Sequence, residues 1–552
     1  MGCSLIADRY VSKGKIMFAI KKKKLTYLRN QWAKKNDRFR NIDLISIYHT
    51  NIISKNSEDY VDDRTWNDLD FDSIFSKMDR NVSSIGQQYL YHILHKYEKD
   101  EAILKERYSL IQYLRKNSSL RESIQLLLGS LMNTKAYFIP SLIITNIPPR
   151  SKYYYLLIIL SVLMFISSSL IYFIPYFLLI TLGFLTINII LSNILSSKIY
   201  DYFAGFSSLR TLLIIARKMS KVKSEIPIKE LNYLRNKKRL IKKLSKKLGK
   251  FVIDKEGLND FVRAAIEYLN LFFLYDLIAY YKSVNILNKY KEEIRGIYES
   301  IASLDTYISI ASYMEEHNTI TTPVFNDSGK IDFENISHPL LENAVPNTID
   351  ELSKSVLITG SNMSGKTTFI KTVGINIILA QTLYFCHADK FDTYHFKVKS
   401  AIKREENLKE SKSYFFVEIE ELQGFIKLAQ SNKKHLFLID EIFRGTNTIE
   451  RLAISTSVLE FLNQHGKVLV TTHDIELQDL LVDSYAMYHF GDQVNGNKYY
   501  FNYKIQKGPC LTGNAIKLLE IKDYPKSITE KAKNLANELN PINIIANDRM
   551  ET

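Results

Sequence analysis

A nine-residue segment, Gly360–Thr368, constrains the fold of this chain more than any other feature. It reads Gly-Ser-Asn-Met-Ser-Gly-Lys-Thr-Thr and fits the phosphate-binding pattern G-x-x-x-x-G-K-[ST]. An apolar run, Val356–Thr359, precedes it, and a helical apolar pattern, Phe369–Leu383, follows it. A strand, a glycine-rich loop and a helix in this order are the structure that the motif requires. The sequence therefore predicts a mixed α and α/β fold with a P-loop domain in its C-terminal part.

The loop residues have expected parts in binding ATP. Glycines let backbone N–H groups curl round phosphate oxygens, at the N-terminus of a helix whose partial positive charge favours anions. Lys366 can reach the β- and γ-phosphates, and the Thr367 hydroxyl can bind Mg²⁺. The predicted nucleotide contacts are Gly360, Ser361, Asn362, Met363, Ser364, Gly365, Lys366, Thr367 and Thr368.

Two further apolar runs end in polar residues that suit ATP hydrolysis. His435–Ile439 is followed by Asp440, expected to hold Mg²⁺ through water, and by Glu441, expected to orient or deprotonate the attacking water. Val468–Thr472 is followed by His473, which can sense the γ-phosphate. A single histidine at a strand end is more often an ordinary residue, and its place after two nucleotide motifs favours the functional role. The predicted catalytic residues are Lys366, Glu441 and His473, and the predicted Mg²⁺ ligands are Thr367 and Asp440.

A second constraint is a stretch of 45 residues, 153–197, without Asp, Glu, Lys, Arg or His. A membrane span needs about 20 apolar residues, so this stretch predicts a transmembrane helical hairpin with spans Tyr153–Phe173 and Tyr176–Leu195 and a turn at Pro175. Lysine and arginine flank both ends, which places both termini and the ATPase domain in the cytoplasm, at the cell (inner) membrane. The alternative is a buried hairpin in a large soluble core.

Two basic segments carry more than the whole excess of positive charge. Arg9–Arg40 holds twelve Lys/Arg and one acid, and Arg217–Lys250 holds fourteen Lys/Arg and two acids. The chain as a whole is +15, so the remainder is about −8 (15 − 11 − 12). The expected partners of these segments are anionic lipid headgroups or nucleic-acid phosphates. The alternative is that both are solvated helix faces.

The three cysteines, Cys3, Cys386 and Cys510, form no Cys-x-x-Cys pair. A disulfide framework, a thiolate zinc site and an iron–sulfur cluster are therefore not expected. The same cysteine usage indicates a protein of a reducing compartment.

At this point the motifs resemble those of the MutS family. The phosphate loop with its Asn-Met pair is similar to the MutS Walker A motif, Asp440–Thr448 to its Walker B motif and D-loop, and Thr471–Asp474 to its histidine switch. Ser413–Leu422 resembles the signature segment that completes the site of a partner subunit. The resemblance implies an ABC-type ATPase that uses ATP and Mg²⁺, in a head-to-head homodimer where Ser413 of one subunit meets ATP on the other.

The resemblance continues more weakly upstream, where residues 68–90 read like the start of the MutS lever domain. On this reading the hairpin interrupts a region of long lever helices. The predicted organisation is a basic N-terminal segment (1–60), the first half of a MutS-like helical core (61–150), a transmembrane hairpin (151–197), a basic segment with return lever helices (198–330), a MutS-type ATPase domain (331–540) and a tail (541–552).

The sequence also departs from a mismatch-repair MutS. We expect no mismatch-reading or connector domain, because the first 150 residues contain no Phe-x-Glu and leave no room for such domains. Two functions therefore stay open. One is a membrane-anchored ATPase with DNA-binding, mismatch-repair ancestry. The other is a mechanochemical or signalling ATPase at the membrane that does not bind DNA. A transporter is disfavoured, because translocation paths are usually marked by charged or polar groups within the membrane.

Overall fold

The protein is described by a computed structural model of residues 1–552. The described residues are 19–35, 37–53, 59–145, 147, 154–198, 200–249, 260–317, 319–361, 363–402, 414–431, 434–443, 446–495, 498–509, 515–522 and 524–538. They divide into two compact units. The helical unit draws on residues 1–58, 75–94 and 105–318, and the sheet unit on 59–74, 95–104 and 319–552.

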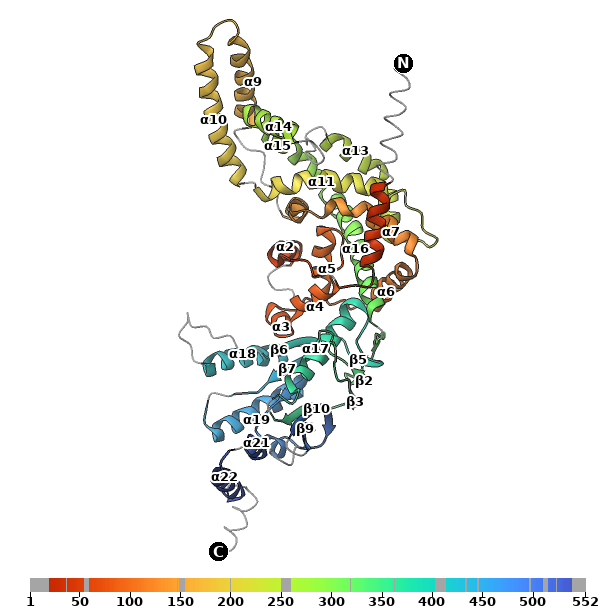
Figure 1. Cartoon of the computed structure of the whole chain (residues 1–552), viewed down its shortest axis with the longest axis vertical. Helices are drawn as coiled ribbons and strands as arrows, with labels where there is room; N and C mark the ends of the chain where they lie inside the picture. Colours follow the sequence, from red (N-terminus) through yellow and green to blue (C-terminus); the bar gives the residue numbers. More distant parts are fainter. Residues whose placement is uncertain are drawn as a thin grey trace. The chain divides into compact units, whose positions relative to one another are not determined.

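The helical unit contains α-helices and two short 3-10 helices (Figure 1). Its first described helix covers residues 19–31. The others are α2 (Ile42–Ile52), α4 (Phe71–Met78), α5 (Ser84–His95), α6 (Glu101–Lys116), α7 (Ser118–Leu128), η1 (Gly129–Leu131), η2 (Thr134–Phe138), α8 (Ile139–Ile143), α9 (Tyr154–Leu170), α10 (Phe177–Lys198), α11 (Tyr200–Met219), α12 (Lys229–Asn236), α13 (Lys238–Gly249), α14 (Asp260–Phe273), α15 (Tyr275–Lys289) and α16 (Lys291–Glu316). Of these, α4, α5 and α6 also contribute residues to the sheet unit.

A buried carboxylate organises the centre of the helical unit. Asp79 follows α4, is fully buried and pairs with the guanidinium groups of Arg38 and Arg40, each at 2.8 Å. Gln87 of α5 donates a further hydrogen bond of 2.7 Å to it. Burial alone would raise the pKa of Asp79, but the two arginines outweigh burial and lower it below its usual value. Two cations of the first basic segment, Arg38 and Arg40, are therefore paired within the protein.

The uncharged stretch forms a pair of packed antiparallel helices, α9 and α10 (Figure 1). Only α10 is long and apolar enough to cross a membrane, over Phe177–Leu195, as judged by length and composition within the described part of the chain. The first predicted span is shorter than expected, because α9 ends at Leu170 and the N–H groups of Phe173 and Ile174 bond back to the Leu170 carbonyl in a turn. Pro175, the residue after this turn, has no N–H with which to continue the helix.

The sheet unit contains a six-stranded and a four-stranded sheet, in the orders β10-β9-β4-β8-β7-β6 and β1-β5-β2-β3. Its strands are β1 (Val324–Phe325), β2 (Ile331–Ile336), β3 (Asn347–Leu352), β4 (Ser355–Gly360), β5 (Lys390–Thr393), β6 (Lys397–Ala401), β7 (His435–Asp440), β8 (Lys467–Thr471), β9 (Tyr485–Asn495) and β10 (Lys498–Lys507). Its helices are α3 (Asp63–Asp68), α17 (Lys366–Leu383), α18 (Tyr414–Ala429), α19 (Thr448–His465), α20 (Glu476–Leu480), α21 (Ala515–Ile521) and α22 (Lys526–Glu538). The expected mixed helix-and-sheet fold is thus confirmed.

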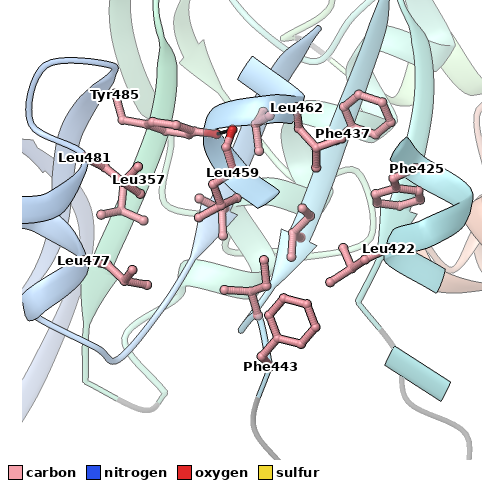
Figure 2. Close-up of a cluster of buried hydrophobic side chains, with 14 of the residues drawn as sticks. Leu357, Leu422, Phe425, Phe437, Phe443, Leu459, Leu462, Leu477, Leu481 and Tyr485 are labelled. Carbon is pink, nitrogen blue, oxygen red and sulfur yellow. Dashed lines mark hydrogen bonds between the residues drawn. The ribbon is translucent and has the colours of Figure 1, made fainter. Parts of the chain in front are cut away.

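Successive side chains of the central strands point to opposite faces of the larger sheet. Phe437 of β7 packs with α18 and α19 in one apolar cluster, which also includes Leu357 of β4 and Tyr485 of β9 (Figure 2). Leu438 points the other way, towards α17, where Gly374 leaves room for it: a Cβ at Gly374 would lie 2.4 Å from the Leu438 Cδ1 atom. Helices therefore cover both faces of the sheet, as a mostly parallel sheet requires.

Two N-terminal segments cover the edge strand β6. The Tyr97 hydroxyl accepts a hydrogen bond from the Val398 N–H (3.3 Å), and the Asp68 carboxylate accepts from the Ile402 N–H (2.9 Å). Asp62 adds an ion pair with Lys399 at 2.9 Å. These groups occupy backbone donors that an exposed sheet edge would leave unpaired. Residues 59–74 and 95–104 are therefore an integral part of the sheet unit.

We predict that Asp79→Asn destabilises the helical unit by about 3–5 kcal/mol, because removing the buried carboxylate leaves two partly buried guanidinium groups without their counter-ion. Amide hydrogen exchange of α16 in the full chain measures the change locally. Asp37→Asn is the control: Asp37 is an exposed partner of Lys35, and such pairs contribute less than about 1 kcal/mol. Equal effects of the two substitutions would contradict the role of Asp79.

The destabilisation caused by Asp79→Asn should also depend on pH. A carboxyl group whose pKa is lower in the folded than in the unfolded protein stabilises the fold above its unfolded pKa, about 3.9 for aspartate, and the stabilisation is lost as the pH falls through the folded value. The cost of Asp79→Asn should therefore be constant near neutral pH and shrink below about pH 4.

Candidate ATP-binding and hydrolysis site

Three neighbouring parallel strands bring the predicted site residues to one edge of the larger sheet. Strand β8 pairs with β4 on one side and with β7 on the other, both in parallel. The carboxyl ends of the three strands therefore meet. The phosphate loop follows β4, Asp440 ends β7 and His473 lies two residues after β8. The order β4-β8-β7 places His473 between the loop and the Asp440–Glu441 pair.

The loop between β4 and α17 has the conformation of an anion cradle. Gly365 has φ +109°, a conformation that side chains rarely adopt, and it immediately precedes α17. The Lys366 ammonium group donates to the carbonyls of Gly360 and Ser361, both at 2.8 Å. Met363 adopts φ +68° and its side chain is exposed.

Ser364 supplies an uncommitted polar group in this loop. Its side chain is buried, and its hydroxyl oxygen has no hydrogen-bond partner among the described residues. An unpaired buried hydroxyl costs free energy, and a phosphate oxygen would supply the missing partner. Ser364, Gly365, Lys366, Thr367 and Thr368 all line the same pocket.

The two predicted Mg²⁺ ligands are in direct contact. The Thr367 hydroxyl donates to both carboxylate oxygens of Asp440, at 3.0 Å each. The Thr471 hydroxyl, at the end of β8, donates to the same carboxylate at 2.5 Å. A hydroxyl beside a carboxylate at the mouth of a phosphate loop is a set of oxygen donors that suits Mg²⁺.

Glu441 and His473 form a pair beside Lys366. The Glu441 carboxylate lies 2.8 Å from Nε2 of His473, and the same nitrogen lies 3.5 Å from the Lys366 ammonium group. The His473 side chain is 34% exposed, so it borders solvent. Glu441 has φ +57°, and its N–H donates to the Thr471 carbonyl at 3.0 Å. Strain of this kind persists only where surrounding bonds hold it, and it is frequent at functional sites.

An ion pair holds the segment that follows His473. Arg451 of α19 donates two hydrogen bonds to Asp474, at 2.9 and 2.8 Å. The Asp474 N–H also bonds the Thr472 hydroxyl at 3.0 Å. A bidentate guanidinium–carboxylate pair fixes geometry as well as charge. Arg451 is therefore a positioning residue for His473, and no motif in the sequence pointed to it.

A pocket of about 420 Å³ opens beside the phosphate loop. Its far wall comes from residues that the sequence analysis gave no binding role, because they belong to no fixed-spacing motif. They are His338, Leu341, Asn343, Ala344, Val345, Asn347, Phe490 and Tyr503. Asn347 holds two walls together, since its amide donates to the Tyr503 carbonyl at 3.1 Å and its oxygen accepts from the Ile505 N–H at 2.8 Å. The aromatic and apolar side chains of this wall suit the base and sugar of a nucleotide.

Two predicted site residues, Asn362 and Ser413, lie outside the described residues. The described part of the signature segment forms α18, whose Glu418 accepts a hydrogen bond from the Phe443 N–H at 2.5 Å. This contact ties α18 to the segment that follows Glu441.

Known proteins relate this site to one class. Residues 356–540 match the family model of MutS domain V. The match begins in β4 and covers the phosphate loop, the Asp440–Glu441 pair and His473.

Particular relatives are found among bacterial repair proteins. The DNA mismatch repair protein MutS of Streptococcus mutans is 31% identical over 266 residues, which are 46% of this chain and 31% of the relative. The MutS protein of Lactobacillus acidophilus is 30% identical over 266 residues, which are again 46% of this chain and 31% of the relative. That of Listeria welshimeri is 30% identical over 284 residues, 48% of this chain and 32% of the relative. The chain thus spans about a third of the length of these relatives, and the matches support a MutS-related family through about half of the chain.

We predict that Arg451→Lys lowers kcat for ATP hydrolysis roughly 10- to 100-fold, since a small displacement of a functional group is enough for such a loss. Nucleotide affinity should stay unchanged, because Arg451 does not line the pocket. The control is Arg64→Lys, the same substitution at an ion pair with Glu421 elsewhere in the sheet unit. An unchanged kcat, or an equal loss of affinity, would refute the positioning role.

Proposed function

We propose that this protein is a Mg²⁺-dependent ATPase of the MutS type that works as a homodimer attached to a membrane. One observation carries the enzymatic part of the proposal. Lys366, Thr367, Asp440, Glu441 and His473 come from three strand ends and meet beside a pocket of nucleotide size. The match to MutS domain V over the same residues supports this reading.

The residues divide the work of hydrolysis between them. Lys366 and the loop N–H groups bind the phosphates, and Ser364 adds its hydroxyl. Thr367 and Asp440 would hold Mg²⁺, which neutralises charge on the phosphate oxygens when bound. Glu441 accepts a proton from the attacking water as its oxygen bonds to the γ-phosphorus and the bond to ADP breaks. His473 contacts the carboxylate of Glu441 through Nε2 and lies next to Lys366, where it can respond to the γ-phosphate.

Exposed apolar side chains beside the site favour a dimer. Phe416 and Ile419 on α18, and Ile449 and Ile454 on α19, are large and exposed, and these two helices pack together. Aromatic and aliphatic side chains of this kind are typical of the centre of a protein interface. In the proposed homodimer the signature segment before α18, with Ser413, completes the site of the partner subunit.

The membrane attachment rests on the hairpin of α9 and α10. Most of its large apolar side chains are exposed, among them Ile159, Phe165, Leu179 and Ile190. A water-exposed surface of this size is unfavourable for a soluble protein, whereas lipid would cover it. The ATPase and both termini would then lie in the cytoplasm.

A specific observation favours DNA as a second partner. Helix α13 buries Ile241, Leu244 and Leu248 and exposes a row of cations on its other face. These cations are Lys238, Arg239, Lys242, Lys243, Lys246 and Lys247. Because the apolar side of α13 is already covered by protein, its free face suits phosphate groups rather than acyl chains. The relatives are named as DNA mismatch repair proteins, which agrees with nucleic-acid phosphates.

Glu441→Gln should reduce ATP turnover by roughly 10²–10⁴-fold, the usual contribution of a general base. The variant should still bind ATP, because glutamine keeps the shape of the side chain, and it should accumulate as an ATP-bound dimer. Turnover assays measure the loss of hydrolysis. Light scattering of the protein as it elutes from a size-exclusion column in ATP measures the accumulation of the dimer. Glu460→Gln, an exposed glutamate of α19, is the control. A Glu441→Gln protein that hydrolyses ATP like wild type would refute the assignment of the base.

The two candidate partners are separated by the ATPase rate of the full chain in lipid nanodiscs. If DNA binds α13, duplex, mismatched or branched DNA should change the rate, and the effect should fade with salt as counterions compete for the phosphates. Exchanging Lys242, Lys243, Lys246 and Lys247 for glutamine should abolish it. A rate that is indifferent to every DNA but sensitive to anionic lipid would assign the protein to work at the membrane alone.

A further inference from the structure

Helix α14 presents its apolar stripe to the outside. Phe261, Tyr268 and Leu269 are 82%, 65% and 56% exposed, and Val262 and Ala265 are exposed with them. Their spacing of i, i+1, i+4, i+7 and i+8 places all five on one face of the helix. An amphipathic helix of a soluble domain would turn this face to the core, so the stripe requires another explanation.

Helix α14 also packs against both helices of the hairpin (Figure 1). Its last carbonyl groups, which a helix end leaves without partners, are bound by side chains of the hairpin. The Asn188 amide of α10 donates to the Phe272 carbonyl, and the Ser161 hydroxyl of α9 donates to the Phe273 carbonyl, each at 2.7 Å. Asn188 is fully buried, so this bond is shielded from water.

The chain then turns sharply into α15. Leu274 adopts φ +49°, is buried and joins the two helices as a single left-handed residue. In lipid every backbone polar group must find a partner within the protein. The corner between α14 and α15 meets that requirement at its helix end, because Asn188 and Ser161 occupy the carbonyl groups that water would otherwise bind.

The position of these bonds along the hairpin gives the depth of the corner. Ser161 lies seven residues from the start of α9 at Tyr154, or about 10 Å at 1.5 Å per residue. The residues around the corner, 268–275, carry no charge, and the next residue is Asp276. An ionisable group so close limits the depth to the boundary between headgroups and acyl chains.

We propose that α14 and its corner with α15 form a third membrane-inserted element, which lies in the interface of the cytoplasmic leaflet with its apolar stripe towards the acyl chains. This inference rests on the membrane attachment proposed above, and it adds a helix that enters only one leaflet of the bilayer. Helix α14 packs against α9 and α10, and all three helices expose apolar side chains, so one bilayer would cover them together. The hairpin would fix the position of α14, and Phe261 and Tyr268 would supply the aromatic side chains that favour the interface.

The test uses tryptophan as a depth probe in the full-length protein, reconstituted in vesicles of phosphatidylcholine and phosphatidylglycerol. The chain has only two tryptophans, so one further tryptophan can be followed as a difference from wild type. Tyr268→Trp reports on α14, and Tyr500→Trp on an exposed site of β10. Leu182→Trp reports on a deeper part of the hairpin, because Leu182 is exposed and lies six residues, about 9 Å, beyond Asn188 towards the turn. Lipids brominated near the headgroup or near the chain end quench fluorescence at matching depths.

The expected result is that headgroup-proximal bromine quenches Tyr268→Trp most strongly, chain-end bromine quenches Leu182→Trp most strongly, and Tyr500→Trp is unaffected. Adding Asn188→Leu to Tyr268→Trp should reduce the quenching of the new tryptophan, because α14 loses the hydrogen bond between Asn188 and the Phe272 carbonyl. The same change combined with Leu182→Trp should leave quenching at the hairpin intact.

Each other outcome overturns a different part. Quenching at position 182 without quenching at 268 would refute the inserted α14 and leave the membrane attachment standing. A blue-shifted but unquenched Tyr268→Trp would show that protein, such as a second copy of the chain, covers the stripe instead. Absence of quenching at both positions would refute the membrane attachment itself.

Discussion

The parallel pairing of β4, β8 and β7 is the constraint on which the candidate site depends. Side chains far apart in the sequence meet only because three parallel strands end at one edge of the sheet. Asp440 is the last residue of β7, and the phosphate loop, Glu441 and His473 lie just after strand ends, where the backbone is free to turn. The apolar cluster and Gly374 hold these strands between helices on both faces (Figure 2). Packing of the core therefore sets the distances within the site.

Each of the two units is stabilised from within by a buried carboxylate. In the sheet unit, Asp68 bonds the Ser400 hydroxyl and the Ile402 N–H, so that an N-terminal segment covers the edge of a C-terminal sheet. In the helical unit, Asp79 performs the same task for Arg38 and Arg40. Breaking either contact would leave buried charge or backbone unpaired, which is far more costly than losing a surface ion pair.

The basic segments show how one composition serves different ends. Arg29, Arg38 and Arg40 of the first segment are paired with Glu122 and Asp79, a role that neither phosphate binding nor a solvated helix face had included. The described cations of α13 instead face outward. The two segments look alike in sequence, because charge counts do not reveal whether an acid from elsewhere in the chain lies opposite a given cation.

The sequence by itself determined the local parts: the phosphate loop, the strand ends with Asp440, Glu441 and His473, and the position of a helical hairpin, since glycine pattern, apolar runs and absence of charge act within a few residues. Residues 59–74 and 95–104 gave no such signal that they pack on β6. Tertiary structure alone decided this packing, the Arg451–Asp474 pair, the wall of the nucleotide pocket and the place of α14 beside the hairpin. Each depends on hydrogen bonds, ion pairs or apolar contacts between residues distant along the chain, and their partners become defined only when the chain folds.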